Sequence, residues 1–187
     1  MLKKEIRVIG IDDSPFRKFQ KNKVLVVGSV FRGGIFLDGI LSTKVSVDGN
    51  DSTKNIAGMI NKSKFKPQLQ CIFLNGISVA GFNVIDISQL SEKTQLPVIV
   101  VIRKNPNIEE IKAALIKINK KGKIKLLEKA GPVIPIGKLY VQLSGIGIEK
   151  AKEIMNIVCT MSLIPEPIRI SHLIASGIVE GESRGKA

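Results

Sequence analysis

The stretch Glu5-Ile6-Arg7-Val8-Ile9-Gly10-Ile11-Asp12-Asp13 decides the fold, because this apolar run ends abruptly in two carboxylates and a turn at Ser14-Pro15. It predicts a buried strand. Side chains alternate along a strand, so Gly10 and Asp12 share one face, and Gly10 is expected to leave open space beside Asp12. A buried strand with an acid at its C-terminal tip is typical of a metal ligand or a catalytic acid. A strand that ends in a solvated turn gives the same pattern.

The composition predicts one basic domain. The chain has 187 residues, of which 44% are hydrophobic, with no Trp, so the core must be aliphatic. We expect a single domain over residues 1–187, with residues 178–187 as a flexible polar tail. The net charge of +13 favours a nucleic acid as partner, because Lys and Arg bind phosphates with counterion release. A Lys-rich surface of the kind found in thermophiles is the alternative.

The location expected from the sequence is the cytoplasm, without membrane association. The N-terminus is charged and lacks a secretory apolar core, and no apolar run approaches membrane-spanning length. Cys71 and Cys159 lie in apolar surroundings without CxxC spacing. They are therefore expected to be buried thiols in a reducing compartment.

The order of predicted elements indicates the fold class. After the first strand, we expect strands at 24–31, 35–47, 69–74 and 96–102, a hairpin turn at 32–34, helices starting at 51, 106 and 147, short β segments at 124–127, 133–136 and 139–143, and a last helix after 165–167. The helix from 147 should reach 161, and the charge run 120–125 should be solvated. Three antiparallel strands, helix, strand, helix, strand is the ribonuclease H-like order. This predicts an α/β fold with a mixed central sheet, antiparallel in its first three strands and then parallel, flanked by helices, with a C-terminal helical pair.

Further polar residues fall where strands end. Asp48 and Asp51 follow the third strand, and they either form a turn and helix cap or place a second carboxylate near Asp12. Asn75 ends a central strand, and Arg103 ends the next. A basic patch close to the tip of the first strand could touch a phosphate; its members are Arg17, Lys18, Lys21 and Lys23.

Several enzyme classes lack their motifs in this sequence. There is no phosphate-binding P-loop, dinucleotide fingerprint, nucleophile elbow or HExxH pair, and His172 is the single histidine. Metal-dependent phosphoryl chemistry is then the enzyme class that best matches strand-tip acids combined with excess positive charge.

Four blocks carry a family resemblance that runs nearly end to end. They are Ile9 to Asp13, Leu74 to Asp86, Leu96 to Ile99, and Ile164 to His172, the last containing Pro165-Glu166-Pro167 and Arg169. Together they resemble the archaeal endonuclease dU family, which is similar in turn to endonuclease V, the nuclease of deaminated bases.

The resemblance implies a divalent-metal endonuclease, using Mg²⁺ or Mn²⁺, that acts on DNA with deaminated bases such as deoxyuridine or deoxyinosine. Asp12 matches the first metal-ligating acid. Asp51 is the implied second ligand, with Asp48 next. Asn75 occupies the third position, where the family usually has Asp.

The same resemblance implies roles for two further side chains at the phosphate. Arg103 would neutralise a phosphate, and His172 matches a histidine at the metal and the scissile phosphate.

Specificity would come from a base turned out of the stack into a pocket. Gly76 and Gly81 within 75–86, and the turn Arg32-Gly33-Gly34, are candidates to line it, since glycine permits close backbone approach. Tight packing and turns explain these glycines equally well. Lys104 and Arg169 complete the predicted nucleic-acid contacts.

Two other functions stay open at this point. A nucleic-acid-binding protein with a decayed metal site is favoured by Asn75, since an amide brings no charge to Mg²⁺. A small-molecule enzyme that uses the same cleft is the third hypothesis, without a cofactor motif to support it.

Overall fold

The computed structural model describes residues 4–16, 23–185 and 187. Seven strands form one mixed sheet in the order β3 (Phe36–Ser46), β2 (Lys23–Arg32), β1 (Arg7–Asp13), β4 (Cys71–Asn75), β7 (Val98–Ile102), β9 (Leu139–Ser144) and β8 (Ile134–Ile136). The first three strands are antiparallel, β4 and β7 run parallel to β1, and β9 and β8 return antiparallel. The predicted mixed sheet is confirmed, with antiparallel strands at its far edge as well.

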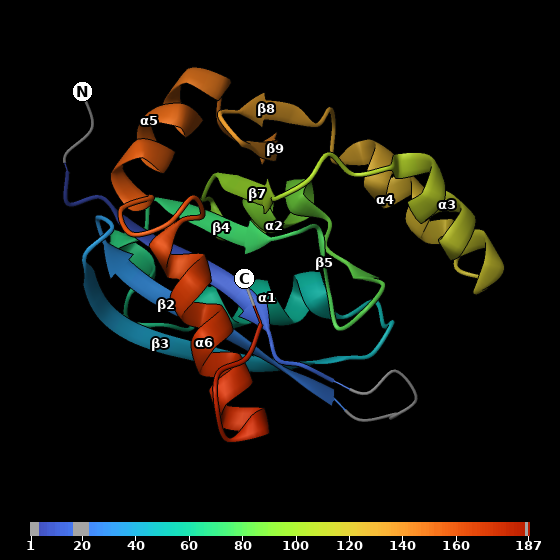
Figure 1. Cartoon of the computed structure of the whole chain (residues 1–187), viewed down its shortest axis with the longest axis horizontal. Helices are drawn as coiled ribbons and strands as arrows, with labels where there is room; N and C mark the ends of the chain where they lie inside the picture. The colour runs from blue at the N-terminus through green and yellow to red at the C-terminus, as the bar shows by residue number, and fades with distance from the viewer. Residues whose placement is uncertain (1–3, 17–22, 186) are drawn as a thin grey trace.

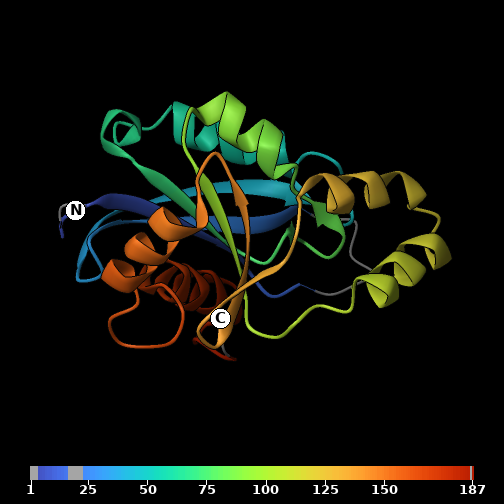
Figure 2. The same cartoon turned by 90° about the horizontal axis from the view of Figure 1, so that it is seen from above.

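Helices cover both faces of this sheet (Figures 1 and 2). One face carries α1 (Ser52–Asn61) and α2 (Ile87–Thr94), with the 3₁₀ turn η1 (Lys66–Gln68) after α1. The other face carries the predicted C-terminal pair, α5 (Ile148–Val158) and α6 (Glu166–Glu180). In Figure 2 the green and orange helices lie on opposite sides of the strands.

Each face has its own aliphatic core, as expected for a sheet covered on both sides. Ile9 and Ile11 of β1 pack toward α1 and α2 with Ile56. Val8 packs on the opposite side with Ile168 of α6. Alternation along β1 therefore sends Asp12 toward the α6 face and Asp13 toward the α1 face.

A short hairpin and a helical arm lie beyond the carboxyl ends of the parallel strands. The hairpin consists of β5 (Ser78–Val79) and β6 (Asn83–Val84). The arm consists of α3 (Ile108–Lys117), η2 (Lys121–Lys123) and α4 (Ile124–Lys129), and it extends to the right of the sheet in Figure 1. It packs against the rest through a small cluster that contains Val84, Leu115 and Leu127.

Three expectations about secondary structure are corrected. Residues 124–127 begin helix α4 and are not a strand, because Ile124 and Leu127 lie one turn apart and pack with the arm. The helix expected over 147–161 ends at Val158. Residues 178–180 are the last turn of α6, and the expected flexible tail folds back on that helix: Ser183 donates to the Leu173 carbonyl and Arg184 N–H donates to Ser176.

Candidate active site

Helix α6 docks unusually closely on strand β1. A Cβ on Gly10 would lie 2.2 Å from the Pro167 carbonyl carbon. The expectation of open space at Gly10 is therefore wrong, because the backbone of α6 occupies it. Ser171 Oγ donates to the Gly10 carbonyl at 2.7 Å and accepts from Ser29 N–H at 2.9 Å, while Ser29 Oγ donates to the Pro167 carbonyl. These buried bonds fix the rotation of α6 and thereby place His172, the next residue, over the tip of β1.

Asp12 is the meeting point of β1, β4 and α6. Its side chain is buried, with a residue exposure of 4%. Oδ2 accepts from Asn75 Nδ2 at 3.1 Å and lies 2.9 Å from His172 Nδ1, and Oδ1 accepts from Asp13 N–H at 3.0 Å. The structure therefore brings together three of the predicted site residues, Asp12, Asn75 and His172, from segments far apart in sequence.

Both ring nitrogens of His172 face groups that can only accept hydrogen bonds. Nδ1 faces the Asp12 carboxylate, and Nε2 lies 3.0 Å from the Arg184 carbonyl. The hydrogen bond to Asp12 is the main reason that the pKa of His172 lies above its usual value, although partial burial acts in the opposite sense. This arrangement favours an imidazolium with a proton on each nitrogen.

Arg103 belongs to the same neighbourhood. It follows the end of β7, is exposed, and its charge lowers the pKa of His172, which places the guanidinium within electrostatic reach of the imidazole. Lys104 is the next residue and is also exposed. The Asp12 centre is thus bordered by cations on the β7 side.

Asp13 points away from this centre toward the β5–β6 hairpin. Its Oδ2 accepts from Ala80 N–H at 2.8 Å. Burial raises the pKa of Asp13 to about 6, with a smaller contribution from the neighbouring charge of Asp12. Asp13 therefore supports the hairpin rather than adding a carboxylate on the α6 side.

The Asp51 carboxylate is saturated by protein donors. It accepts from the backbone N–H and hydroxyl of Ser46, from Asn83 Nδ2 at 2.7 Å and from Asn55 Nδ2 at 3.3 Å. A carboxylate has about four acceptor positions, and four donor groups already point at this one. Asp51 is the residue before α1 but makes no side-chain cap. It instead ties the end of β3 to β6.

Asp48 is likewise part of the loop framework. Its Oδ1 accepts from Phe82 N–H at 2.7 Å, and its carbonyl accepts from Lys120 and Lys123. The carboxylates of Asp48 and Asp51, the two residues predicted to supply a second acid, therefore both accept hydrogen bonds from the protein framework. Within residues 4–16, 23–185 and 187, no three His, Cys, Asp or Glu side chains are grouped to hold a metal ion.

The predicted base-pocket turn Arg32-Gly33-Gly34 lies at the wrong end of the sheet. Arg32 pairs with Arg7, whereas Asp12 pairs with Val27, five residues further along β1, or about 16 Å. The glycines have a packing role: a Cβ on Gly33 would lie 2.6 Å from the Lys4 carbonyl oxygen. These residues are too distant to line a pocket at Asp12.

The other predicted nucleic-acid contacts are divided. Gly76 follows Asn75 with a positive φ of 78° and open space around an added Cβ, so its backbone is accessible near the centre. Gly81 is held against Asp48, since an added Cβ would lie 2.5 Å from Asp48 Oδ1. Arg169 is engaged by Glu166 in a two-oxygen ion pair, with a shortest distance of 2.7 Å.

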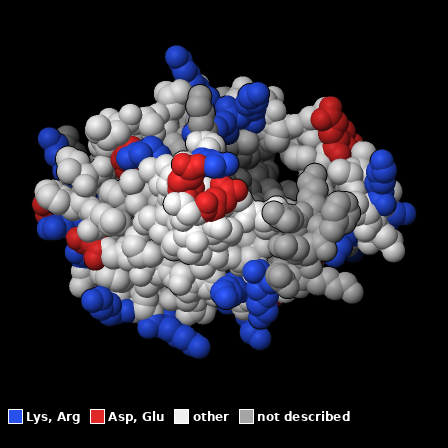
Figure 3. All heavy atoms as spheres, turned by 60° about the horizontal axis from the view of Figure 1, so that its bottom comes forward, with Lys and Arg blue, Asp and Glu red and all other residues white. Residues whose placement is uncertain are grey.

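Some of the expected positive charge cannot be placed. Arg17, Lys18 and Lys21 lie outside the described residues, and Lys23 is exposed at the start of β2. On the face shown in Figure 3, Lys and Arg side chains gather at several separate places around the rim, with a smaller acidic group near the middle. The described residues of that face therefore do not form one continuous basic patch.

Two structural features escaped the sequence analysis. Lys123, expected to be solvated, is only 5% exposed, and its ammonium donates to the carbonyls of Asp48, Gly49 and Phe82. Ser171 and Ser29 dock α6. The position of Ser171 next to the single histidine could have indicated its role from the sequence. Nothing in the sequence distinguished Lys123 from the neighbouring lysines.

The order and direction of the strands, with helices on both faces, give a ribonuclease H-like fold similar to that of endonuclease V. An Endonuclease V from Ciona intestinalis, solved with a 24mer DNA containing an inosine followed by a ribo-adenosine, has a TM-score of 0.62 at 17% identity and covers 94% of this chain and 86% of its own. Endonuclease_V from Bacillus subtilis has a TM-score of 0.60 at 9% identity, with 94% and 81% covered. At these identities the likeness establishes the fold, and it confirms the predicted fold class.

The chain belongs to the Endonuclease dU family, whose model matches residues 4–179. A UPF0215 protein of Methanothermobacter thermautotrophicus is 49% identical over 191 residues, which is 100% of this chain and 94% of that protein. A protein of unknown function from Archaeoglobus fulgidus has a TM-score of 0.87 and 40% identity, with 94% and 99% covered. The resemblance inferred from sequence is confirmed, and the family together with the fold supports a nuclease.

None of the helices in the described part of the chain has the length and apolar character needed to cross a membrane.

Proposed function

We propose that the protein is a divalent-metal-dependent endonuclease that nicks DNA beside deaminated bases, deoxyuridine or deoxyinosine, and serves in DNA repair. The observation that carries the proposal is the Asp12 centre, where a buried carboxylate at a strand tip is joined by Asn75 and His172. Membership of the Endonuclease dU family supports the reaction class. The inosine-containing DNA bound to the Ciona relative supports DNA as the partner.

The side chains at the centre fit a Mg²⁺ or Mn²⁺ ion that keeps part of its water shell. Mg²⁺ is often held by one or two carboxylates together with waters and phosphate oxygens, and Asp12 supplies one carboxylate. Asn75 offers an amide oxygen once its amide is turned, since the two ends of an amide are interchangeable in shape. When bound, the metal activates water and stabilises charge on the phosphate.

The residues of the chain then have separate tasks in hydrolysis. Asp12 orients the His172 ring through Nδ1 and stabilises its positive charge. In the substrate complex, a phosphodiester oxygen replaces the Arg184 carbonyl at Nε2, and His172 donates its proton to the sugar oxygen that leaves phosphorus. Arg103 neutralises the phosphate. Asp48 and Asp51 are omitted from the proposed ligands because their oxygens accept hydrogen bonds from the protein framework.

A non-catalytic nucleic-acid-binding protein is the second candidate. It is favoured by Asn75 at a position that usually has Asp in this family, and by the lack of a three-acid group among the described residues. This candidate predicts salt-sensitive binding that does not depend on metal.

A nicking assay separates the two candidates. Duplexes with one uracil, one hypoxanthine or normal bases are incubated with Mg²⁺, Mn²⁺ or EDTA, using the parent protein and Asn75→Asp. The nuclease proposal predicts lesion-dependent, EDTA-sensitive nicks that increase in Asn75→Asp. Tight binding without nicks in either protein would support the non-catalytic candidate instead.

A further inference from the structure

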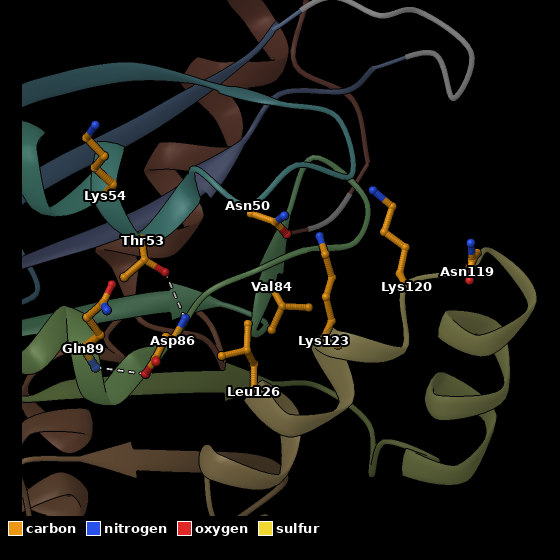
Figure 4. A pocket seen from close by; sticks show the side chains of 11 residues that line it. Asn50, Thr53, Lys54, Val84, Asp86, Gln89, Asn119, Lys120, Lys123 and Leu126 are labelled. Atoms are coloured by element: carbon orange, nitrogen blue, oxygen red, sulfur yellow. Dashed lines mark hydrogen bonds between the residues drawn. The ribbon is translucent and has the colours of Figure 1, made fainter.

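A cavity away from the Asp12 centre lies between the helical arm and the α1–α2 face (Figure 4). Its volume is about 640 Å³, against 370 to 510 Å³ for four other cavities formed by the described residues. Asn50 and Thr53 border it on the α1 side, Gln89 on α2, and Lys123 and Leu126 on the arm. Asp12, Asn75 and His172 do not line it.

Two lysines at this cavity share one acceptor and lack a carboxylate partner. Lys120 Nζ and Lys123 Nζ donate to the same Asp48 carbonyl oxygen, at 2.7 and 3.0 Å. Neither forms an ion pair within the described part of the chain. Burial and then the charge of Lys120 lower the pKa of Lys123 to about 8. The charges of Asp48 and Asp51 act on this pKa in the opposite sense. Lys123 donates to three carbonyls, whereas Lys120 donates to one, so Lys120 is the lysine with N–H donors left for an anion.

The one acid that lines the cavity does not offset these charges. Asp86 forms an ion pair with Lys129 at 2.7 Å, and its Oδ1 accepts from Gln89 N–H at 2.9 Å, which caps α2. Lys54 adds a further cation at the rim. The cavity therefore carries excess positive charge.

The neutral lining suits a planar heterocycle. Val84 and Leu126 form an apolar wall, and Figure 4 shows them side by side between the arm and the sheet. The side-chain amides of Asn50, Gln89 and Asn119 make no hydrogen bond to another described residue. Amides pair with both donors and acceptors on a base edge, and apolar side chains contact a base face.

We propose that this cavity is a nucleotide-binding site, with the phosphate at Lys120 and the base against Val84 and Leu126. Its volume lies within the range of small-ligand sites, about 300–1,000 Å³. The nucleotide is either free or a unit of a nucleic-acid strand. Only the strand form rests on the proposed nuclease function.

The test is equilibrium binding of deoxynucleoside 5′-monophosphates, the matching nucleosides, inorganic phosphate and a short single-stranded oligodeoxynucleotide to the full chain. We expect the monophosphate to bind more tightly than either the nucleoside or phosphate. Lys120→Met and Leu126→Glu each weaken binding by about tenfold or more, because one removes a charged donor and the other adds a repelling carboxylate. Lys125→Met, at an exposed lysine of the same helical arm that does not line the cavity, is the control and leaves affinity unchanged.

The outcomes separate this site from the nuclease centre. Asp12→Ala should retain nucleotide binding, and Lys120→Met should retain the nicking rate at saturating DNA. Oligonucleotide affinity that falls with Lys120→Met indicates a strand unit, whereas monophosphate affinity alone indicates a free nucleotide. Equal affinity for phosphate and monophosphate, no binding at millimolar ligand, or equal loss in Lys125→Met would overturn the proposal, whatever the nicking assay shows.

Discussion

The Asp12 centre and the Asp48–Asp51 loop are both acidic sites at strand ends, yet they differ in what surrounds their oxygens. Asp12 faces the side chains of Asn75 and His172, which are themselves candidate site residues. Asp51 faces two groups of Ser46 together with Asn83 and Asn55, and these bonds hold β3, α1 and β6 together. The comparison teaches that the donors around a carboxylate, rather than its place at a strand end, separate a ligand from a structural support.

The largest expected effect is at Asp12. Asp12→Asn keeps the shape of the side chain but removes the negative charge that holds a metal and the His172 imidazolium. We expect nicking to fall by about 10³-fold or more, equivalent to several kcal/mol of transition-state stabilisation. Single-turnover cleavage of a uracil- or hypoxanthine-containing duplex measures this. Activity within a few fold of the parent would move the chemistry away from this centre.

Asp51 should affect stability instead. Asp51→Ala leaves Ser46, Asn83 and Asn55 without their acceptor in a partly buried site, so we expect the free energy of unfolding to fall by about 2–4 kcal/mol. Urea denaturation measures it, with Asp38→Ala, which removes a partly buried ion pair with Arg7, for comparison. An unchanged unfolding midpoint would show that these hydrogen bonds are not the role of Asp51.

His172 should have an intermediate effect. His172→Gln retains a hydrogen-bonding side chain but removes the proton donor, and general acid catalysis contributes about 10²–10⁴-fold. We therefore expect cleavage to fall by about 10²-fold while DNA affinity changes little. A loss of affinity that matched the loss of rate would assign His172 to binding alone.

The smallest effect is the titration of His172, the single histidine in the chain. Its pKa is raised in the folded state, so its interaction with Asp12 stabilises the fold fully below pH about 6.5 and is lost as pH rises through the folded pKa. NMR of the one imidazole in EDTA should give a pKa above 6.5 that falls in Asp12→Asn. Burial raises the pKa of Asp13 from 3.8 to about 6. The ionisation of Asp13 therefore destabilises the fold as pH rises from 3.8 to about 6. A His172 pKa at or below 6.5 would remove the charged pair from the centre.

The sequence predicted most of the fold because the fold depends on local patterns. Apolar runs interrupted by Gly and polar turns set the strands, and the order of elements set the sheet. The arm was misjudged at residues 124–127, since a short apolar run fits a helix or a strand equally well. Its packing against Val84, which comes from a distant part of the chain, decides between them.

Asp12 and Asn75 were expected as residues at strand ends, and His172 was expected from the family resemblance. Asp12, Asn75 and His172 meet because β1 and β4 are parallel neighbours and because α6 docks on Gly10. Saturation of Asp51 by Asn83 and burial of Lys123 under the 48–50 loop depend on contacts between distant segments. No spacing in the sequence records such contacts.

The most direct test compares Asp12→Asn and Asp51→Asn side by side in single-turnover nicking of the same lesion duplex, with Mn²⁺, per folded molecule. We predict that Asp51→Asn cleaves within about threefold of the parent, because its oxygens belong to the framework, while Asp12→Asn falls to background. Loss of cleavage in Asp51→Asn as complete as in Asp12→Asn, with the fold intact, would contradict the assignment of the chemistry to the Asp12 centre.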